Sequence, residues 1–388
     1  MSFSVVQKEQ KYLDPSKIGV EAGNLEAHLR SNIIGQPEAI TDIVSIYQLY
    51  LSGMSQPGKP IANFLFLGPT GSGKTRIVEV AAEALVGSAK SVIKVDCAEF
   101  QHSHEIAKLV GSPPGYLGHR ETQPLLSQEV LNQYHSDSVK ISLVLFDEIE
   151  KANDALWELL LGIMDKATLT LGDNRRVDFS KAMIFMTSNL GAKEMGAVLN
   201  PKMGFHVPLP IGEINKKIIS AGIAAARRRF TPEFINRLDK MTVFNPLGEA
   251  ELREILDIEL MFIQNRIFGC GGTSSFIFTV NEAAKQFLME GGVDIKHGAR
   301  HIKRSIELIL VRPLSNLIAT QQVLGGDLLV VDYDSENKCL TFVRKERGLS
   351  LRIMKELVSQ QRGGKTFNPI PVSDAGAVFL KSNPSRRR

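Results

Sequence analysis

A glycine-rich stretch in this chain ends in a lysine and a threonine. Residues 68–75 read Gly-Pro-Thr-Gly-Ser-Gly-Lys-Thr, which fits the spacing G-x-x-x-x-G-K-[S/T]. A short apolar segment, residues 63–67, precedes the stretch, and a helical pattern follows it over residues 74–86. Glycines let backbone N–H groups turn toward phosphate oxygens, and the N-terminus of the following helix adds positive potential. The stretch in this context predicts a phosphate-binding loop.

The last two residues of the loop carry its main polar side chains. Lys74 is expected to reach the β- and γ-phosphates of a nucleotide, and the Thr75 hydroxyl to bind Mg²⁺. Contacts to the nucleotide are expected from the whole loop: Gly68, Pro69, Thr70, Gly71, Ser72, Gly73, Lys74 and Thr75. A chance glycine-rich turn is the alternative, and the flanking strand and helix disfavour it.

Two carboxylates follow a second apolar segment. Residues 141–146 are mostly apolar, and Asp147 and Glu148 come directly after them. Ligands of α/β sheets bind at the carboxyl ends of strands, so this pair is expected beside the loop. Asp147 would hold Mg²⁺ through water, and Glu148 would polarise the water that attacks the γ-phosphate. The pattern predicts ATP and Mg²⁺ as cofactors, although a lone Asp-Glu pair is also common in acidic turns.

A third polar group ends the next candidate strand, in the sequence Thr187-Ser188-Asn189. The amide of Asn189 could orient the attacking water or contact the γ-phosphate. Ser-Asn pairs are also ordinary turn residues, so this signal is weak by itself.

The elements that must position these residues alternate between strand and helix. The candidate strands are residues 63–67, 91–95, 141–146, 182–187 and 241–244. This alternation predicts an α/β fold, with a mostly parallel sheet flanked by helices on both faces. Later residues predict a smaller α+β domain, with helices at 249–267, 282–290 and 299–319 and strands at 276–280, 328–331 and 340–343. The expected organisation is a flexible N-terminal arm (1–25), an ATP-binding α/β domain (26–245), a small C-terminal α+β lid domain (246–344) and a basic tail (345–388).

Composition excludes several classes of protein. The 388 residues are 43% hydrophobic and 23% charged, which is typical of globular proteins. The net charge of +4 does not indicate a nucleic-acid partner, although residues 344–388 alone hold 11 Lys/Arg and 3 Asp/Glu. The three cysteines have no C-x-x-C spacing, and the histidines at 102, 104, 119 and 135 match no zinc pattern. No signal pattern and no apolar run of about 20 residues is present, so we expect a cytoplasmic protein without membrane contact.

Six stretches together resemble AAA+ ATPases of the Clp chaperone family, specifically the second ATPase module of ClpB-like disaggregases. They occur in the order and spacing of that family and read NFLFLGPTGSGKT (63–75), LVGSPPGYLG (109–118), LFDEIEK (145–151), VDFSKAMIFMTSNLG (177–191), FTPEFINRLD (230–239) and GGVDIKHGARHIKR (291–304). The resemblance covers roughly residues 25–343. It implies a P-loop AAA+ domain followed by a small Clp C-terminal domain.

The resemblance also implies roles for residues outside the loop. Arg237 matches the arginine finger that reaches the nucleotide of the neighbouring subunit, with the arginines at 227–229 as rivals, so that Glu148, Asn189 and Arg237 form the expected catalytic set. Arg300 matches a sensor arginine that contacts the nucleotide of its own subunit. The segment containing Ile34 resembles the lining of the adenine pocket. Tyr116 and Leu117 match the pore loop that grips polypeptide substrate.

The function implied is an ATP-dependent protein unfoldase or remodelling chaperone that works as a homo-oligomer of six subunits on unfolded or aggregated polypeptide. Two features depart from the family. His119-Arg120 replaces the usual acidic pair after the pore loop, and no Ile-Gly-Phe or Ile-Gly-Leu tripeptide for docking a ClpP-like protease is present. The alternative is a nucleotide-switched AAA+ scaffold, or a nucleic-acid-associated module, that recruits partners through its basic tail.

Overall fold

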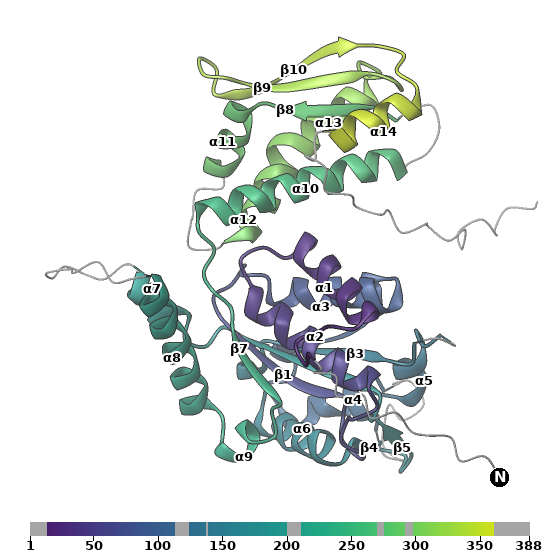
Figure 1. Ribbon diagram of the computed structural model, residues 1–388, viewed down its shortest axis with the longest axis vertical. Helices are drawn as coiled ribbons and strands as arrows, with labels where there is room; N and C mark the ends of the chain where they lie inside the picture. Colours follow the sequence, from purple (N-terminus) through teal and green to yellow (C-terminus); the bar gives the residue numbers. More distant parts are fainter. Residues whose placement is uncertain are drawn as a thin grey trace, which may run out of the picture.

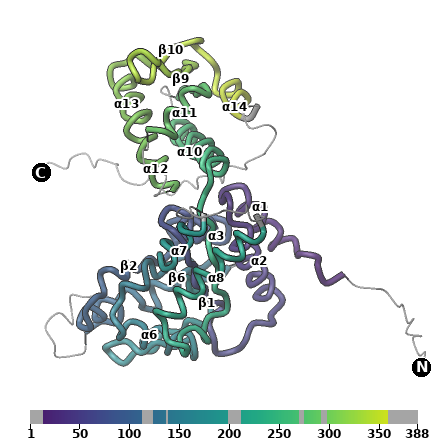
Figure 2. Tube along the Cα trace, turned by 90° about the vertical axis from the view of Figure 1, so that its left-hand side faces the viewer, coloured from purple at the N-terminus to yellow at the C-terminus, as the bar shows by residue number. Residues whose placement is uncertain are grey.

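The computed structural model describes residues 14–112, 124–136, 139–199, 211–269, 275–291 and 298–360. A larger α/β part and a smaller α+β part are joined by the segment that follows strand β7 (Lys240–Val243). Figures 1 and 2 show the smaller part lying over the end of the larger part that carries helices α1 (Val20–Asn32) and α3 (Lys74–Val86).

The larger part is built on a five-stranded sheet in the order β2-β3-β6-β1-β7, in which every pairing is parallel. Its other strands are β1 (Ala62–Leu67), β2 (Val92–Asp96), β3 (Ser142–Asp147) and β6 (Ala182–Ser188). β1, β3 and β6 are almost completely buried, as expected for strands covered on both faces. In the register, Leu67 lies beside Ser188, so the residues that follow β1 and β6 meet at one edge of the sheet.

Alternate side chains of the central strands form two separate apolar layers. On one face, Phe64 and Phe66 pack with Phe185 and with residues of α1, α2 (Pro37–Leu51) and α3. On the other face, the intervening Leu65 and Leu67 join a cluster with residues of α6 (Asp154–Lys166), α7 (Ala192–Leu199) and α8 (Ile211–Arg229). Figure 1 shows the helices arranged around the sheet in this way. The two layers hold the sheet rigid beneath its carboxyl edge.

Short elements complete the larger part. They are the helices α4 (Ala107–Val110), α5 (Gln128–Asn132) and α9 (Pro232–Ile235), and a hairpin of β4 (Thr168–Thr170) and β5 (Arg176–Asp178). The sequence did not predict this hairpin, because its three-residue strands are too short to show a clear alternation.

The smaller part packs helices against a three-stranded sheet in the order β10-β9-β8, in which β8 and β9 are parallel and β9 and β10 antiparallel. Its elements are α10 (Glu249–Gly269), β8 (Ile277–Val280), α11 (Glu282–Glu290), α12 (Ala299–Ser305), a π-helical turn (Ile306–Val311), α13 (Arg312–Ala319), β9 (Leu328–Asp334), β10 (Cys339–Glu346) and α14 (Leu351–Gln360). Their apolar side chains form one core of their own.

The predicted fold class, a parallel sheet flanked by helices followed by a small α+β part, is confirmed. The helix predicted over residues 299–319 is interrupted by the π turn immediately before Arg312-Pro313, where proline lacks an N–H for the regular helical ladder. None of the helices in the described ranges is long and apolar enough to cross a membrane.

The folded parts extend into both of the terminal segments that the sequence predicts as an arm and a tail. α1 begins at Val20 and buries Ala22, so the arm predicted over residues 1–25 overlaps a packed helix. At the other end, β10 continues to Glu346 and α14 buries Met354, so the first part of the tail predicted from residue 345 belongs to the folded small part. In both places a few apolar contacts within a polar stretch anchor the chain.

Candidate nucleotide-binding site

The phosphate-binding loop leaves the carboxyl end of β1 and enters α3 at Lys74. Gly68, Gly71 and Gly73 have φ angles of 149°, 78° and 99°, which favour glycine. Gly68 also lies against Phe244, because a Cβ atom built there would be 2.8 Å from the Phe244 carbonyl oxygen. The glycines are therefore required by the curvature of the loop, which turns backbone N–H groups toward one centre.

Lys74 is buried within this loop. Its Nζ donates hydrogen bonds to the carbonyl oxygens of Gly68 at 2.8 Å and Pro69 at 2.9 Å, and to Asn189 Oδ1 at 3.1 Å. Burial lowers the pKa of Lys74 to about 8, and the negative charges of Glu150 and Asp147 oppose this effect. All three hydrogen-bond acceptors are neutral, so they do not cancel the ammonium charge. This charge is therefore available to bind phosphate oxygens.

Asp147 lies at the end of β3, beside the hydroxyls of two threonines. Thr75 Oγ1 donates to Asp147 Oδ1 at 3.4 Å, and Thr187 Oγ1 donates to the same oxygen. A carboxylate and a hydroxyl are ligands that suit Mg²⁺, which usually binds through one or two protein groups together with substrate phosphates. No group of three or more His, Cys, Asp or Glu side chains that could hold a metal occurs in the described ranges. Thr75 and Asp147 therefore fit a Mg²⁺ ion that the nucleotide brings with it.

Glu148 has a left-handed backbone conformation, with a φ of 57°, which is uncommon for a residue other than glycine. Its N–H donates to Thr187 Oγ1 at 3.1 Å, and its Oε1 accepts a hydrogen bond from Asn189 Nδ2 at 3.1 Å. The carboxylate also forms an ion pair with Lys151. The hydrogen bond from Lys151 is the main cause that lowers the pKa of Glu148, so this group is ionised at neutral pH and can act as a general base.

Asn189 connects the phosphate-binding loop to this carboxylate. Its Oδ1 accepts from Lys74 and, at 3.3 Å, from Thr70 Oγ1, while its Nδ2 donates to Glu148. The amide thus lies between the lysine that faces phosphate and the carboxylate that would face water. The structure brings these residues together as the order of β1, β3 and β6 in the sheet requires.

Gln36 fixes the loop from the other side. Its Nε2 donates to the carbonyl oxygens of Ser72 at 3.2 Å and Asn245 at 2.9 Å, and its Oε1 accepts from the Asn245 N–H at 2.9 Å. Gln36 therefore ties the phosphate-binding loop to the segment that joins the two parts. Ile34 lies two residues away and is half-buried, and its contact with adenine remains a prediction.

The small part reaches the loop through the start of α12. The Ala299 N–H donates to the Gly71 carbonyl oxygen at 3.2 Å. Arg300 is exposed next to this contact, and its charge contributes to lowering the pKa of both Lys74 and Glu148. A second contact between the parts is the Arg76 guanidinium, 5.1 Å from the centre of the Phe262 ring. Arg300 therefore lies on the same side as the phosphate-binding loop.

Arg237 lies away from this site. Its guanidinium pairs with Asp165 Oδ1 at 2.8 Å and Glu233 Oε1 at 2.9 Å. Its carbonyl oxygen accepts from Asn63 Nδ2, and Asn63 is near the amino end of β1, opposite the loop. Arg237 therefore contacts none of the predicted nucleotide ligands of its own chain.

The rival arginines are exposed at the end of α8. Arg228 pairs with Glu194, while Arg229 donates to the Glu150 carbonyl oxygen at 3.2 Å and lies 4.2 Å from the centre of the Trp157 ring. Arg229 therefore contacts its own chain just beyond Glu148. The predicted pore-loop residues Tyr116 and Leu117 lie outside the described residues.

Sequence reasoning missed three contributors to the site: Thr187, Lys151 and Glu150. Thr187 bonds both acidic residues of the site, Lys151 pairs with Glu148, and Glu150 Oε1 accepts the Asn189 N–H at 3.0 Å. The closely spaced charges of Asp-Glu-Ile-Glu-Lys (147–151) were the available signal.

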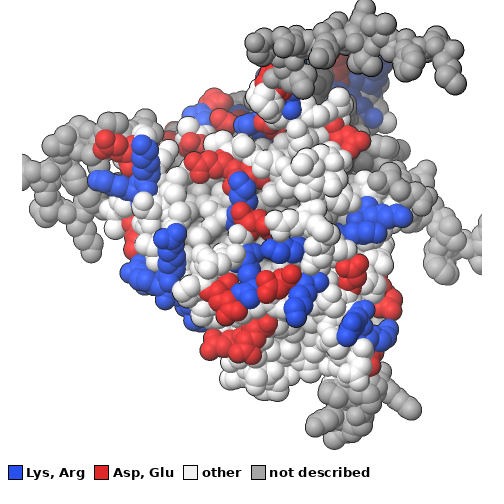
Figure 3. Space-filling view, turned by 60° about the horizontal axis from the view of Figure 1, so that its bottom comes forward, with Lys and Arg blue, Asp and Glu red and all other residues white. Residues whose placement is uncertain are grey.

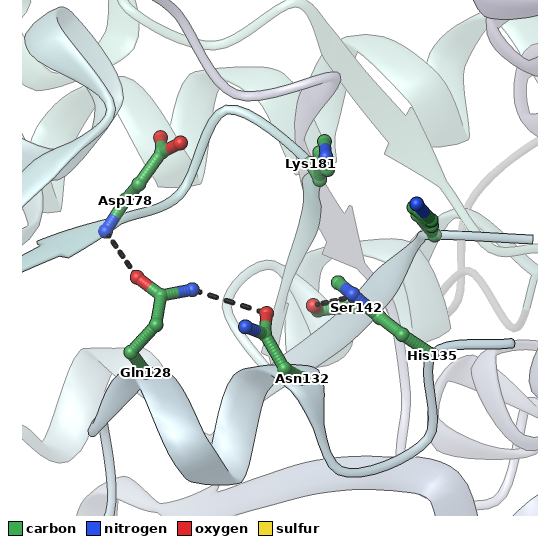
Figure 4. A pocket seen from close by; sticks show the side chains of 7 residues that line it. Gln128, Asn132, His135, Ser142, Asp178 and Lys181 are labelled. Atoms are coloured by element: carbon green, nitrogen blue, oxygen red, sulfur yellow. Dashed lines mark hydrogen bonds between the residues drawn. The ribbon is translucent and has the colours of Figure 1, made fainter. Parts of the chain in front are cut away.

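A separate polar pocket of about 430 Å³ lies at the opposite, amino-terminal end of β3. Figure 4 shows Gln128 accepting from the Asp178 N–H and donating to Asn132, and His135 against Ser142. The pocket is also lined by Lys140 and Lys181. None of the predicted site residues lines it, so it is distinct from the nucleotide site.

Comparison with known proteins agrees with this geometry. Residues 59–241 match the model of the AAA domain (Cdc48 subfamily), and residues 247–331 match the C-terminal, D2-small domain of ClpB protein. The chain belongs to the Clp family of AAA+ ATPases. The predicted resemblance to the second ATPase module of ClpB-like proteins is thereby confirmed.

This Clp-family chain is similar to two curated relatives in sequence and to one solved structure in fold. It is 35% identical over 313 residues to the ATP-dependent Clp protease ATP-binding subunit ClpC of Staphylococcus saprophyticus, covering 81% of this chain and 36% of that protein. It is 34% identical over 308 residues to chaperone protein ClpB of Clostridium perfringens, covering 79% and 33%. A closed-state reconstruction of Hsp104 with ATPγS and FITC casein matches 83% of this chain and 52% of its own, with a TM-score of 0.67 and 30% identity. The chain spans about a third of the length of these curated relatives.

Proposed function

We propose that this Clp-family chain is an ATP-dependent protein unfoldase or remodelling chaperone, which hydrolyses Mg-ATP in a ring and threads polypeptide through a central pore. The observation that carries the proposal is the hydrogen-bonded series from Lys74 through Asn189 to Glu148, at the carboxyl edge of the sheet. It joins a cation suited to phosphate, an amide and an ionised carboxylate. These groups suit phosphoryl transfer to water, which depends on positioning and charge stabilisation.

The chain's own residues divide the work of hydrolysis. Lys74 and the loop N–H groups bind the β- and γ-phosphates, and Asn189 orients the γ-phosphate and the attacking water. Glu148 accepts the proton of that water. Thr75 and Asp147 would hold Mg²⁺, which would neutralise charge on the phosphate oxygens.

The position of Arg237 supports completion of the site by a neighbouring subunit. A guanidinium on the edge opposite its own loop cannot assist its own nucleotide, but a head-to-tail ring brings the edge of one subunit to the site of the next. The ion pairs with Asp165 and Glu233 fix the Arg237 guanidinium at that edge. We therefore propose a homo-oligomeric ring, of six subunits as in the family.

The proposed substrate is an unfolded polypeptide, gripped by Tyr116 and Leu117. The similar Hsp104 structure is named for a complex with casein, which favours this class of substrate. Lys/Arg and Asp/Glu side chains are interspersed on the face seen in Figure 3, which favours no polyanion there. The scaffold alternative depends on the basic residues near the C-terminus.

The test compares ATP turnover without addition, with unfolded casein and with DNA, for the wild type and Glu148→Gln, after sedimentation has established the oligomer. The proposal expects stimulation by casein and loss of turnover in Glu148→Gln. Stimulation by DNA alone would favour the nucleic-acid alternative, and unchanged turnover in Glu148→Gln would contradict the site assignment.

A further inference from the structure

The turn Ile149–Lys151, which follows Glu148, contacts the backbone of Asn189. Glu150 Oε1 accepts the Asn189 N–H at 3.0 Å, and this is the residue whose amide bonds both Lys74 and Glu148. The other carboxylate oxygen, Glu150 Oε2, is buried and has no hydrogen-bond partner among the described residues. Glu150 thus supports Asn189 but lies outside the set of groups expected to touch ATP.

The same turn is held on its other side by Arg229 and Trp157. Arg229 Nη2 donates to the Glu150 carbonyl oxygen at 3.2 Å, and Trp157 Nε1 donates to the Ile149 carbonyl oxygen at 3.1 Å. The Arg229 guanidinium lies over the Trp157 ring, 4.2 Å from its centre, in a cation–π arrangement. The turn is therefore held by the Glu150 side chain against Asn189 and by its backbone carbonyls against Arg229 and Trp157.

An aromatic cluster continues from this contact toward Arg237. The Trp157 ring meets Phe230 at 5.3 Å between centroids, and Phe230 stacks on Phe234 at 5.1 Å. Phe234 belongs to α9, and its carbonyl oxygen accepts the Arg237 N–H at 3.2 Å. Phe230 and Phe234 are almost completely buried, so this cluster links Trp157 by close packing to the segment that carries Arg237.

We propose that Glu150 and Arg229 are positioning residues that couple the nucleotide site of one subunit to its Arg237, and so to hydrolysis in the neighbouring subunit. The proposal rests on the proposed trans role of Arg237. Contact of Asn189 with the γ-phosphate shifts the turn through Glu150, and Arg229 and Trp157 pass the shift to α9. The coupling element is the turn itself, which contacts Asn189 through the Glu150 carboxylate and Arg229 through the Glu150 carbonyl oxygen.

The experiment measures the effect of Arg229 in trans, in rings mixed from two kinds of subunit. Acceptor subunits carry Arg237→Ala, so their sites are intact but their fingers are lost. Donor subunits carry Glu148→Gln, so they bind ATP without hydrolysing it and supply the finger. Turnover of the mixture then reports only acceptor sites completed by donor fingers.

Adding Arg229→Ala to the donor should lower turnover of the mixture about tenfold, which corresponds to one lost hydrogen bond to a charged group. Adding Arg228→Ala instead should leave turnover within twofold, because the partner of this neighbouring arginine among the described residues is the exposed Glu194. A donor with Lys74→Ala, which cannot signal occupancy, should resemble the Arg229→Ala donor.

A second measurement addresses Glu150 within one subunit type. Glu150→Ala should lower kcat about tenfold with little change in the affinity for ATPγS, and Glu150→Gln should restore most of it, because its amide oxygen still accepts the Asn189 N–H. Equal loss of affinity and rate, or failure of Gln to rescue, would show a merely structural role and overturn the assignment.

The outcomes distinguish a failure of the coupling through Arg229 from a failure of the proposed trans role of Arg237. An inactive mixture of the two parent subunits contradicts the trans role of Arg237 and therefore the proposed function. An active parent mixture in which the Arg229→Ala and Arg228→Ala donors behave alike overturns the coupling alone. If Arg229→Ala donors do not assemble, Arg229→Lys keeps the charge without the planar fork, and full turnover with that donor also overturns the coupling.

Discussion

The contact between the small part and the phosphate-binding loop offers a sharp test of the site, through the substitution Gly298→Ala. Gly298 has a φ of 57°, and a Cβ atom built there would lie 2.9 Å from the Gly71 carbonyl oxygen. Both the strained conformation and the close approach therefore oppose a side chain. The next residue, Ala299, donates its N–H to the same oxygen, so the clash acts on the bond that docks α12 against the loop.

The expected magnitude follows from these two effects. A non-glycine residue at the φ of 57° and ψ of −142° that Gly298 adopts, a sparsely populated region, costs about 1–3 kcal/mol, and loss of the hydrogen bond from Ala299 costs about 0.5–1.5 kcal/mol. If the small part moves off the loop to relieve the clash, Arg300 moves with it. We expect the affinity for ATPγS to fall by about 10- to 1,000-fold, since the two costs together amount to about 1.5–4.5 kcal/mol and about 1.4 kcal/mol corresponds to each factor of ten.

The assay is titration with a fluorescent ATP analogue, with ATPγS as competitor, alongside a thermal melt. Gly87→Ala is the matched control, because Gly87 has a φ of 81° but nothing within 4 Å of a Cβ built there. Gly87→Ala carries the milder strain of a left-handed (αL) backbone without a clash, so it should lower the melting temperature slightly and leave the affinity for ATPγS unchanged. Wild-type affinity in Gly298→Ala would refute the reasoning that the small part docks on the loop through this contact.

Three further predictions address the remaining parts of the site. Glu148→Gln should keep the affinity for ATP and slow hydrolysis by about 10²- to 10⁴-fold, measured by phosphate release, whereas Lys74→Ala should weaken ATP binding itself. Gln36→Ala removes three hydrogen bonds that tie the loop to Asn245, so it should lower the free energy of unfolding by about 1–3 kcal/mol in urea titrations; a change under 0.5 kcal/mol would count against this role. Tyr116→Ala should keep basal ATP turnover within a few fold and abolish unfolding of a fluorescent substrate, because the residue is expected to touch polypeptide and not nucleotide; unimpaired unfolding would favour the scaffold alternative.

Local features of the sequence were sufficient to predict the parts of the site that depend on a few adjacent residues. The glycine spacing before Lys74 predicts the loop, because positive φ angles and close backbone approach require glycine there. The central strands were readable as apolar runs because both of their faces are covered. Asp147 and Glu148 could be assigned to the same edge because parallel strands bring their carboxyl ends together.

Only the tertiary structure could show which distant groups touch. The sequence carries no sign that the Glu150 carboxylate bonds the Asn189 N–H, or that Arg229 caps the same turn, since these contacts join residues 39 and 79 positions apart. The docking of Gly298 on Gly71 depends on the angle between the two parts, which no local pattern encodes. Arg237 was recognisable by its motif, yet its place at the edge opposite its own loop is a consequence of sheet order. Local chemistry therefore determined the kinds of group in the site, and packing of remote segments decided their connections.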